Sequence, residues 1–290
     1  MVSKNISVVV CTKNEEFRIE DCLKSIHQND PDEIIVVDGG SKDSTVDIAH
    51  KYTKIVIQSY DSNLTRDRQK GIDAAKNEYV AMIDSDHRLS EGDLQSLLID
   101  MEKYGFDIVQ SQLVSFKNHN FWNKAEEESW HLTHNLPGPK KMIGVAPAVF
   151  KKEIFQKIRF DDKITTTIDD TDFMYRLSMI PGISYGIGET KVYQLHFSTL
   201  KDYIKKFMWY GSGDGEFCIK HPSRAFSMIF HLLVRYPLLY PIRAIIKGKY
   251  RVIPYFIMQG YIRFYGMISR IISLKINIGR SNLKGGLGWI

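Results

Sequence analysis

The chain has 290 residues, of which 43% are hydrophobic and 25% are charged, and this composition excludes a disordered or fibrous protein. Its three cysteines, Cys11, Cys22 and Cys218, show no paired metal-ligand spacing, which argues against a disulfide framework and for a reducing compartment. The net charge of +5 conceals an asymmetry, because residues 197–290 carry +12 and the rest of the chain carries −7.

The first 90 residues alternate short apolar runs with amphipathic segments. The apolar runs predict strands at 6–10, 34–37, 55–58 and 79–83, and helical periodicity predicts helices at 15–26, 44–52 and 66–75. This alternation predicts an α/β fold with a mostly parallel sheet that has helices on both faces. Ligands of such sheets bind at the carboxyl ends of the strands, and polar clusters follow Val10, Val37 and Ile83.

Asp84 and Asp86 follow the last of these strands, with Ser85 between them. Residues i and i+2 of an extended chain point the same way, so the two carboxylates can face one target. Their oxygens suit hard divalent cations such as Mg²⁺ or Mn²⁺. The alternative is a polar turn that merely ends the strand, but the position beside two other polar clusters favours a metal site.

The middle of the chain is less regular. Residues 93–104 predict an amphipathic helix, and a strand is expected near 107–114. Residues 115–141 show no clear period, so we expect a loop or short helix that lines a cleft, with a structural insertion as the alternative.

From Lys201 onward the pattern changes to long apolar stretches at 226–246 and 252–274, each interrupted by arginine and proline. A central arginine in a spanning helix costs on the order of 2.5–3.5 kcal/mol, so helices that lie in the membrane interface fit better than spanning ones. Soluble helices remain the other alternative. We therefore expect a catalytic domain over 1–200 and a basic, aromatic-rich helical region over 201–290.

Four motifs occur in a fixed order along the chain. They are Val8-Val9-Val10-Cys11-Thr12-Lys13-Asn14-Glu15, Ile35-Val36-Val37-Asp38-Gly39-Gly40-Ser41, Arg68-Gln69-Lys70-Gly71 before Asp84-Ser85-Asp86, and Ile168-Asp169-Asp170-Thr171-Asp172. Over residues 5–215 this series resembles the family 2 glycosyltransferases of GT-A fold. The resemblance implies a Rossmann-like domain, a UDP- or GDP-sugar donor, a Mg²⁺ or Mn²⁺ cofactor and inverting transfer to a hydroxyl group.

The resemblance also implies roles for single residues. The donor would be bound by Thr12, Asn14, Glu15, Asp38, Arg68, Asp84 and Ser85. Asp86 would coordinate the metal directly, Asp84 would hold the ribose or support the metal, and His196 is a candidate third metal or phosphate contact.

Asp169 and Asp170 match an acidic pair whose second member acts as catalytic base, with Asp169 orienting the acceptor. Neighbouring carboxylates disfavour each other's ionisation, which raises the pKa of a base toward neutrality. Residues 209–215 lack the Gln-x-x-Arg-Trp signature of processive synthases, which favours addition of a single sugar. The glycines in this segment indicate a flexible lid or a domain joint.

The basic, aromatic tail indicates a membrane surface and a polyprenyl- or dolichyl-linked acceptor in glycan biosynthesis, with no nucleic-acid partner. We expect the protein at the cytoplasmic face of the cell membrane, peripheral or monotopic, because a strand begins near residue 6 with no signal peptide before it. Two alternatives stay open. A nucleotidyltransferase would usually carry a glycine-rich loop near residues 11–15, and a nucleic-acid-binding module would not need the long apolar runs.

Overall fold

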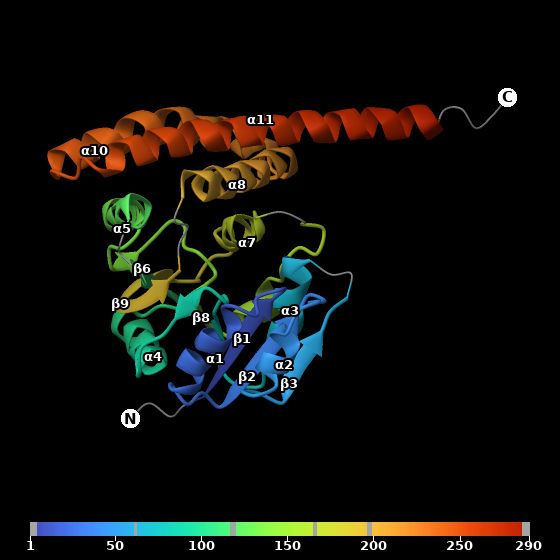
Figure 1. Ribbon diagram of the computed structural model, residues 1–290, viewed down its shortest axis with the longest axis vertical. Coiled ribbons are helices and arrows are strands. Elements are labelled where there is room, and N and C mark those ends of the chain that lie inside the picture. The colour runs from blue at the N-terminus through green and yellow to red at the C-terminus, as the bar shows by residue number, and fades with distance from the viewer. Residues whose placement is uncertain (1–4, 61–62, 117–119, 165–166, 196–198, 286–290) are drawn as a thin grey trace. The chain divides into compact units, whose positions relative to one another are not determined.

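The computed structural model describes residues 5–60, 63–116, 120–164, 167–195 and 199–285, and they divide into two compact units (Figure 1). The first unit consists of Met1–His119, Thr133–Thr165 and Asp169–His196, and the second of Asn120–Leu132, Thr166–Ile168 and Phe197–Ile290. The chain therefore crosses between the units immediately before Asp169.

The first unit contains a mixed sheet. In the part of the chain that the structure describes, nine strands run in the order β3-β2-β1-β4-β8-β6-β9-β5, with β7 paired to β9. Their bounds are β1 (Ile6–Thr12), β2 (Glu33–Asp38), β3 (Ile55–Gln58), β4 (Tyr79–Met82), β5 (His87–Arg88), β6 (Ile108–Ser115), β7 (Gly138–Pro139), β8 (Ala148–Lys151) and β9 (Tyr185–Gln194). Strands β3, β2, β1 and β4 are parallel, whereas β8 is antiparallel to both β4 and β6. The predicted α/β fold class is confirmed.

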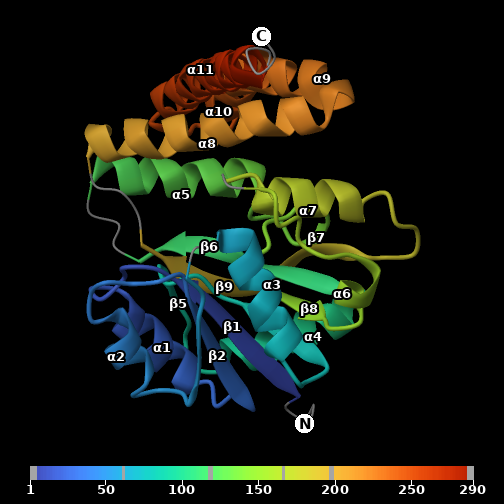
Figure 2. The same cartoon turned by 90° about the vertical axis from the view of Figure 1, so that its right-hand side faces the viewer.

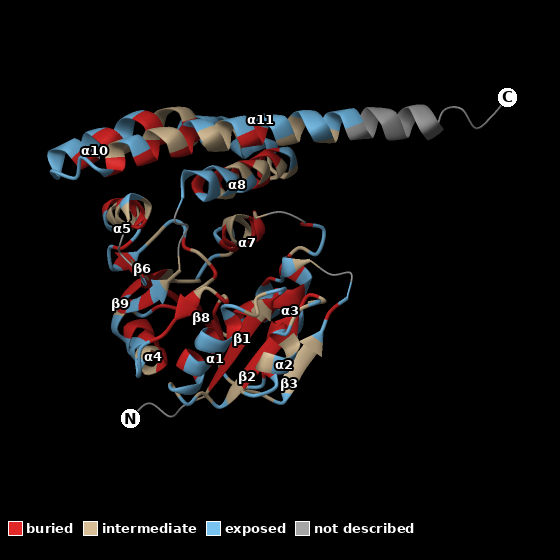
Figure 3. Ribbon diagram, in the orientation of Figure 1, coloured by how far each residue is buried: buried red, intermediate tan, exposed pale blue. Residues whose placement is uncertain are grey.

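Helices cover both faces of this sheet, as Figure 2 shows for α3. The first face packs against α1 (Ile19–His27), α2 (Thr45–Ala49) and α4 (Asp93–Tyr104), and the second against α3 (Leu64–Ala74), α6 (Ile154–Lys157) and α7 (Asp169–Leu177). Successive side chains of β1 alternate between the two cores, with Val8 and Val10 in one and Val9 in the other. This is why the central strands are buried along their length (Figure 3).

A glycine brings α3 directly onto the sheet. A Cβ atom on Gly71 would lie 2.3 Å from Cγ1 of Val9 and 3.1 Å from Cγ2 of Val37, so a larger residue would push the helix away. Arg68 lies three residues earlier, on the same side of the helix. The close approach therefore carries Arg68 to the region where β1 and β4 end.

The second unit is helical. It contains α5 (Phe121–Thr133, whose last residue belongs to the first unit), α8 (Leu200–Lys220), a short 3₁₀ turn (Pro222–Arg224), α9 (Ala225–Phe230), a π-helical segment (His231–Leu239), α10 (Tyr240–Ile246) and α11 (Val252–Gly285). Aromatic side chains such as Tyr203, Phe207, Tyr255 and Phe256 form much of its core. Where the sequence predicted a loop or short helix, α5 is a helix of 13 residues.

Glycines also allow α8 and α11 to touch. A Cβ on Gly211 would lie 2.2 Å from the carbonyl oxygen of Arg263, and one on Gly266 would lie 2.6 Å from that of Met208. Asp214 of α8 accepts two hydrogen bonds from the Arg263 guanidinium, at 2.8 and 2.7 Å. The expectation of a flexible lid or joint at these glycines is wrong, because residues 200–220 form one continuous helix.

One helical segment among the described residues, Pro222–Ile246, has the length and the apolar composition needed to cross a membrane. Only 28% of its most apolar window is buried inside the protein.

Candidate functional site

A pocket of about 460 Å³ opens where β1 and β4 end. Three residues predicted to bind the donor line it: Thr12, Glu15 and Ser85. The sequence order of the strands changes direction here, because β2 pairs with one side of β1 and β4 with the other. Such a switch point leaves a crevice at the carboxyl ends of the strands, which explains why the polar residues meet here.

Glu15 and Ser85 both line the pocket. Burial raises the pKa of Glu15 above its ordinary value, and the nearby Asp86 carboxylate acts in the same direction. The pocket wall thus combines the loop after β1 with the turn after β4.

Two other predicted donor residues hold loops together and do not line the pocket. Asn14 adopts a left-handed conformation (φ 54°), which asparagine tolerates better than most residues. Its backbone N–H donates to Oγ of Ser41, and its side-chain oxygen accepts from the N–H of Lys42, both at 2.8 Å. These bonds fix the loop after β1 against the loop after β2.

Asp38 is buried at the end of β2, and its own loop occupies its carboxylate. Oδ2 accepts the backbone N–H groups of Gly40 and Ser41 at 3.0 and 2.9 Å, and Oδ1 accepts the hydroxyl of Ser41. The predicted contact of Asp38 with the nucleoside stays a prediction, but this carboxylate already has three donors.

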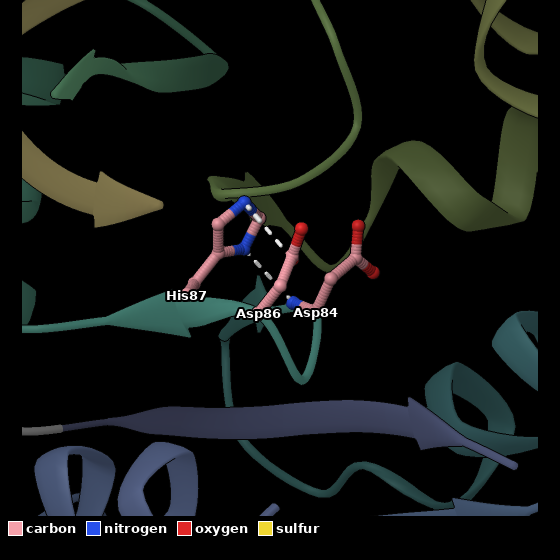
Figure 4. Close-up of side chains that lie close together, drawn as sticks. All are labelled: Asp84, Asp86 and His87. Atoms are coloured by element: carbon pink, nitrogen blue, oxygen red, sulfur yellow. Dashed lines mark hydrogen bonds and ion pairs between the residues drawn. The ribbon is translucent and has the colours of Figure 1, made fainter. Parts of the chain in front are cut away.

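The side chains of Asp84, Asp86 and His87 converge in the turn after β4 (Figure 4). One potential ligand atom from each lies within 4.8 Å of the others. Strand β4 ends at Met82 and the chain turns before His87, so the two carboxylates converge through a turn and not along an extended strand. We call this segment the Asp84–His87 turn.

His87 holds this turn closed. Its Nδ1 accepts the backbone N–H of Asp84 at 3.0 Å, so the neutral ring carries its hydrogen on Nε2, which lies 3.8 Å from Oδ1 of Asp86. Oδ2 of Asp86 accepts a hydrogen bond of 2.9 Å from Nε2 of Gln194. His87 and Gln194 therefore orient Asp86.

The two carboxylates fit a hard divalent cation, because both are partly exposed and supply oxygen ligands. His87 adds no ligand in the tautomer that its hydrogen bond selects. His196, the other predicted metal contact, lies outside the described residues.

Arg68 connects the Asp84–His87 turn to the fourth motif. Its side chain is only 7% exposed, with Nη2 3.3 Å from Oδ1 of Asp84 and Nε 3.3 Å from Oδ2 of Asp169. A buried guanidinium needs such partners, because its desolvation is otherwise unfavourable. The structure thus brings together Asp84 and Asp169, which are 85 positions apart, through one cation.

Asp169 and Asp170 begin α7. Burial, reinforced by the neighbouring Asp169 carboxylate, raises the pKa of Asp170 to about 7. Burial also raises the pKa of Asp169, although Arg68 opposes that shift. Oδ1 of Asp170 accepts the backbone N–H of Thr171 at 2.8 Å, which fixes the side chain at the start of the helix.

Sequence reasoning missed several residues of the pocket, namely Cys11, Lys13, Gly39, Asn63, Leu64 and Asp67. Asp67 is the most unusual of these, because it is only 6% exposed on a helix whose other acid, Asp73, is exposed. Its position directly before Arg68 could have identified Asp67 as a site residue, because both residues lie on the turn of α3 that meets the sheet.

Three kinds of comparison place the chain among known proteins. The family model described as glycosyl transferase family 2 matches residues 7–180. The GalNAc(5)-diNAcBac-PP-undecaprenol beta-1,3-glucosyltransferase of Campylobacter jejuni is 28% identical over 54% of this chain and 55% of its own length. The putative glycosyltransferase EpsH of Bacillus subtilis is 40% identical over 30% of this chain and 27% of its own. The chain thus matches between about a quarter and just over half of these relatives.

Among solved structures, TarS 1–349 of S. aureus has a TM-score of 0.53 at 15% identity and covers 95% of this chain and 91% of its own. The structure of the same protein in complex with UDP-GlcNAc has a TM-score of 0.52, again at 15% identity. At this identity the likeness concerns the fold.

Proposed function

The chain belongs to glycosyl transferase family 2, and on that basis we propose that it transfers one sugar from a UDP- or GDP-sugar to a hydroxyl group of a lipid-linked saccharide, with inversion and a divalent cation. One observation carries this proposal. Arg68 contacts both Asp84, in the turn suited to a cation, and Asp169, beside the candidate base. A leaving diphosphate and an acceptor hydroxyl require these two functions at the same site.

Asp170 is the proposed base. The acceptor hydroxyl proton passes to its carboxylate while the acceptor oxygen forms a bond to the anomeric carbon. The bond from that carbon to the diphosphate breaks, and its electron pair leaves with the nucleoside diphosphate. A pKa of about 7 suits this role, because a general base works best when its pKa is near the operating pH.

Asp84 and Asp86 are the proposed ligands of Mg²⁺ or Mn²⁺. A bound cation would offset the negative charge that develops on the departing diphosphate. His87 and Gln194 hold the Asp86 carboxylate in position, and Nη2 of Arg68 lies 3.3 Å from Oδ1 of Asp84.

The acceptor proposal rests on the second unit. Residues 217–290 contain 12 Lys and Arg and neither Asp nor Glu, and large apolar side chains such as Phe226 and Ile246 are 80% and 75% exposed. Exposed apolar groups among positive charges suit an anionic membrane surface. The name of the C. jejuni relative also contains an undecaprenol-linked saccharide. We therefore propose a polyprenyl- or dolichyl-linked acceptor.

The test is a panel of UDP- and GDP-sugars with the full chain and a polyprenyl-linked saccharide. We expect release of nucleoside diphosphate with one of the donors in Mn²⁺ or Mg²⁺, and its loss in EDTA. Turnover that EDTA leaves unchanged would contradict the metal proposal. Release of pyrophosphate from a nucleoside triphosphate would instead indicate a nucleotidyltransferase.

A further inference from the structure

Asp67 is a buried acid in the pocket that the mechanism above does not use. Its Oδ1 atom is fully buried and has no hydrogen-bond partner among the described residues. Its Oδ2 atom would lie 3.1 Å from a Cβ on Gly39, so the absence of a side chain at position 39 leaves room for this carboxylate. Both residues line the pocket.

An unpartnered buried carboxylate oxygen is unfavourable, and a binding site explains it when a ligand supplies the missing donor. The hydroxyl oxygen of Thr12, also in the pocket wall, is likewise buried without a partner in the described structure. Two unsatisfied polar atoms in one wall indicate a ligand with polar edge groups.

The other carboxylates nearby have partners of their own. Asp38 accepts three hydrogen bonds from its loop, close to the four or so that a carboxylate can accept. Oε2 of Glu15 lies 3.7 Å from Nη1 of Arg18 in an ion pair. Asp67 is therefore the acid of this pocket best placed to accept a new donor.

Lys13 supplies the complementary charge. Its side chain passes beside the same glycine, with Cδ 3.4 Å from the position of a Cβ on Gly39, and it is exposed. Asp67 and Lys13 thus offer an acceptor and a donor beside Gly39, in the wall of the same pocket. A ligand edge that carries an N–H group next to a carbonyl oxygen complements this pair.

We propose that Asp67 accepts the ring N–H of the donor's nucleobase and thereby selects uracil or guanine over cytosine and adenine. Uracil and guanine carry a protonated ring nitrogen beside a carbonyl group. At the corresponding position cytosine and adenine carry an unprotonated nitrogen, whose lone pair would face the carboxylate. This inference rests on the proposed function, because it assumes that the pocket holds the nucleotide of the sugar donor.

The experiment measures dissociation constants of UDP, GDP, CDP and ADP with the full chain in Mn²⁺, by calorimetry. We expect UDP or GDP to bind at least about tenfold more tightly than CDP and ADP, in line with the usual strength of hydrogen bonds to charged groups. Asp67→Asn should weaken binding of the preferred nucleotide about 10- to 100-fold and leave CDP within a few-fold.

Asp73→Asn is the matched control, because Asp73 lies on the same helix, is exposed and does not line the pocket. Gly39→Ala is a second variant that keeps Asp67 but crowds its Oδ2 atom, and it should reduce the same preference. If the unchanged protein binds all four nucleotides equally, or Asp67→Asn keeps its preference, the inference is overturned. If no nucleoside diphosphate binds at all, the proposed function fails first.

Discussion

At the scale of single residues, Arg68 connects two acidic motifs, because its guanidinium contacts both Asp84 and Asp169. The motif order predicted that Asp84, Asp169 and Arg68 belong to one site, but no sequence spacing indicates which carboxylates a guanidinium will contact. That outcome depends on how deeply α3 packs against the sheet. Similarly, the sequence places Asp38 at the end of a strand. It does not show that the Asp38 carboxylate accepts hydrogen bonds from the backbone of Gly40 and Ser41, because those bonds depend on the conformation of the loop.

Asp170 provides the residue-scale prediction. Asp170→Asn should lower kcat by about 10²- to 10⁴-fold, the usual contribution of a general base, while the dissociation constant for the nucleoside diphosphate changes little. Asp162→Asn is the control, because Asp162 is an exposed acid of the preceding loop. A variant at position 170 with unchanged turnover would exclude this residue as the base.

The pH profile follows from the same group. The base must be ionised, and its pKa is raised to about 7, so kcat should fall as pH drops below neutrality and level off above about pH 8. Asp170→Asn should remove this dependence from its residual rate. A wild-type rate that stays flat from about pH 5.5 to 8.5 would contradict the assignment.

At the scale of helices and strands, hydrophobic periodicity identified elements wherever one face is apolar. The helix expected at 93–104 and the strand at 55–58 have the predicted bounds. Helix α5 was predicted only as a loop or short helix, because its buried face is mostly polar: it includes Asn123, Glu126 and Ser129. The glycines of α8 led to the wrong expectation of a flexible lid or joint. Glycine is favoured both in flexible segments and where two helices pack closely, and the sequence does not distinguish the two.

The position of α3 is testable at Gly71. Gly71→Ala should lower the free energy of unfolding by about 1–3 kcal/mol, because the added methyl group overlaps Val9 beneath the helix. Nucleotide binding should weaken as well, since α3 carries Asp67 and Arg68. Arg66→Ala on the same helix removes only an exposed ion pair and should change stability by less than about 1 kcal/mol. Equal urea midpoints for the two variants would show that α3 tolerates the displacement.

At the scale of the whole molecule, residues 197–290 carry a surplus of positive charge and the rest of the chain carries a surplus of negative charge. Arg243, Lys247 and Lys249 are exposed close to the apolar Ile242, Ile245 and Ile246. Replacing the three cations with Gln should weaken binding to phosphatidylserine-containing vesicles roughly 100-fold, because each contributes about 1 kcal/mol near an anionic surface. Cosedimentation measures this effect, and added salt should reduce it.

The control replaces Lys24, Lys54 and Lys76, which are equally exposed in the first unit, with Gln. Both triple variants lose three charges, so a nonspecific effect of net charge would weaken vesicle binding equally in each. We expect vesicle binding to weaken only in the variant at Arg243, Lys247 and Lys249. Equal weakening in both variants would argue against the second unit as the membrane-binding surface.

The contacts of Arg68 have a consequence for which anions the protein admits. Asp84 and Asp169 place two carboxylates against a single guanidinium, and Asp86 adds a third carboxylate near Asp84, so this part of the site has a surplus of negative charge when they are ionised. We therefore expect this part of the site to repel inorganic phosphate and other small anions. On the proposed function, a nucleotide sugar would overcome that repulsion only together with a bound cation, so the same carboxylates would disfavour binding of the abundant phosphates of a cell.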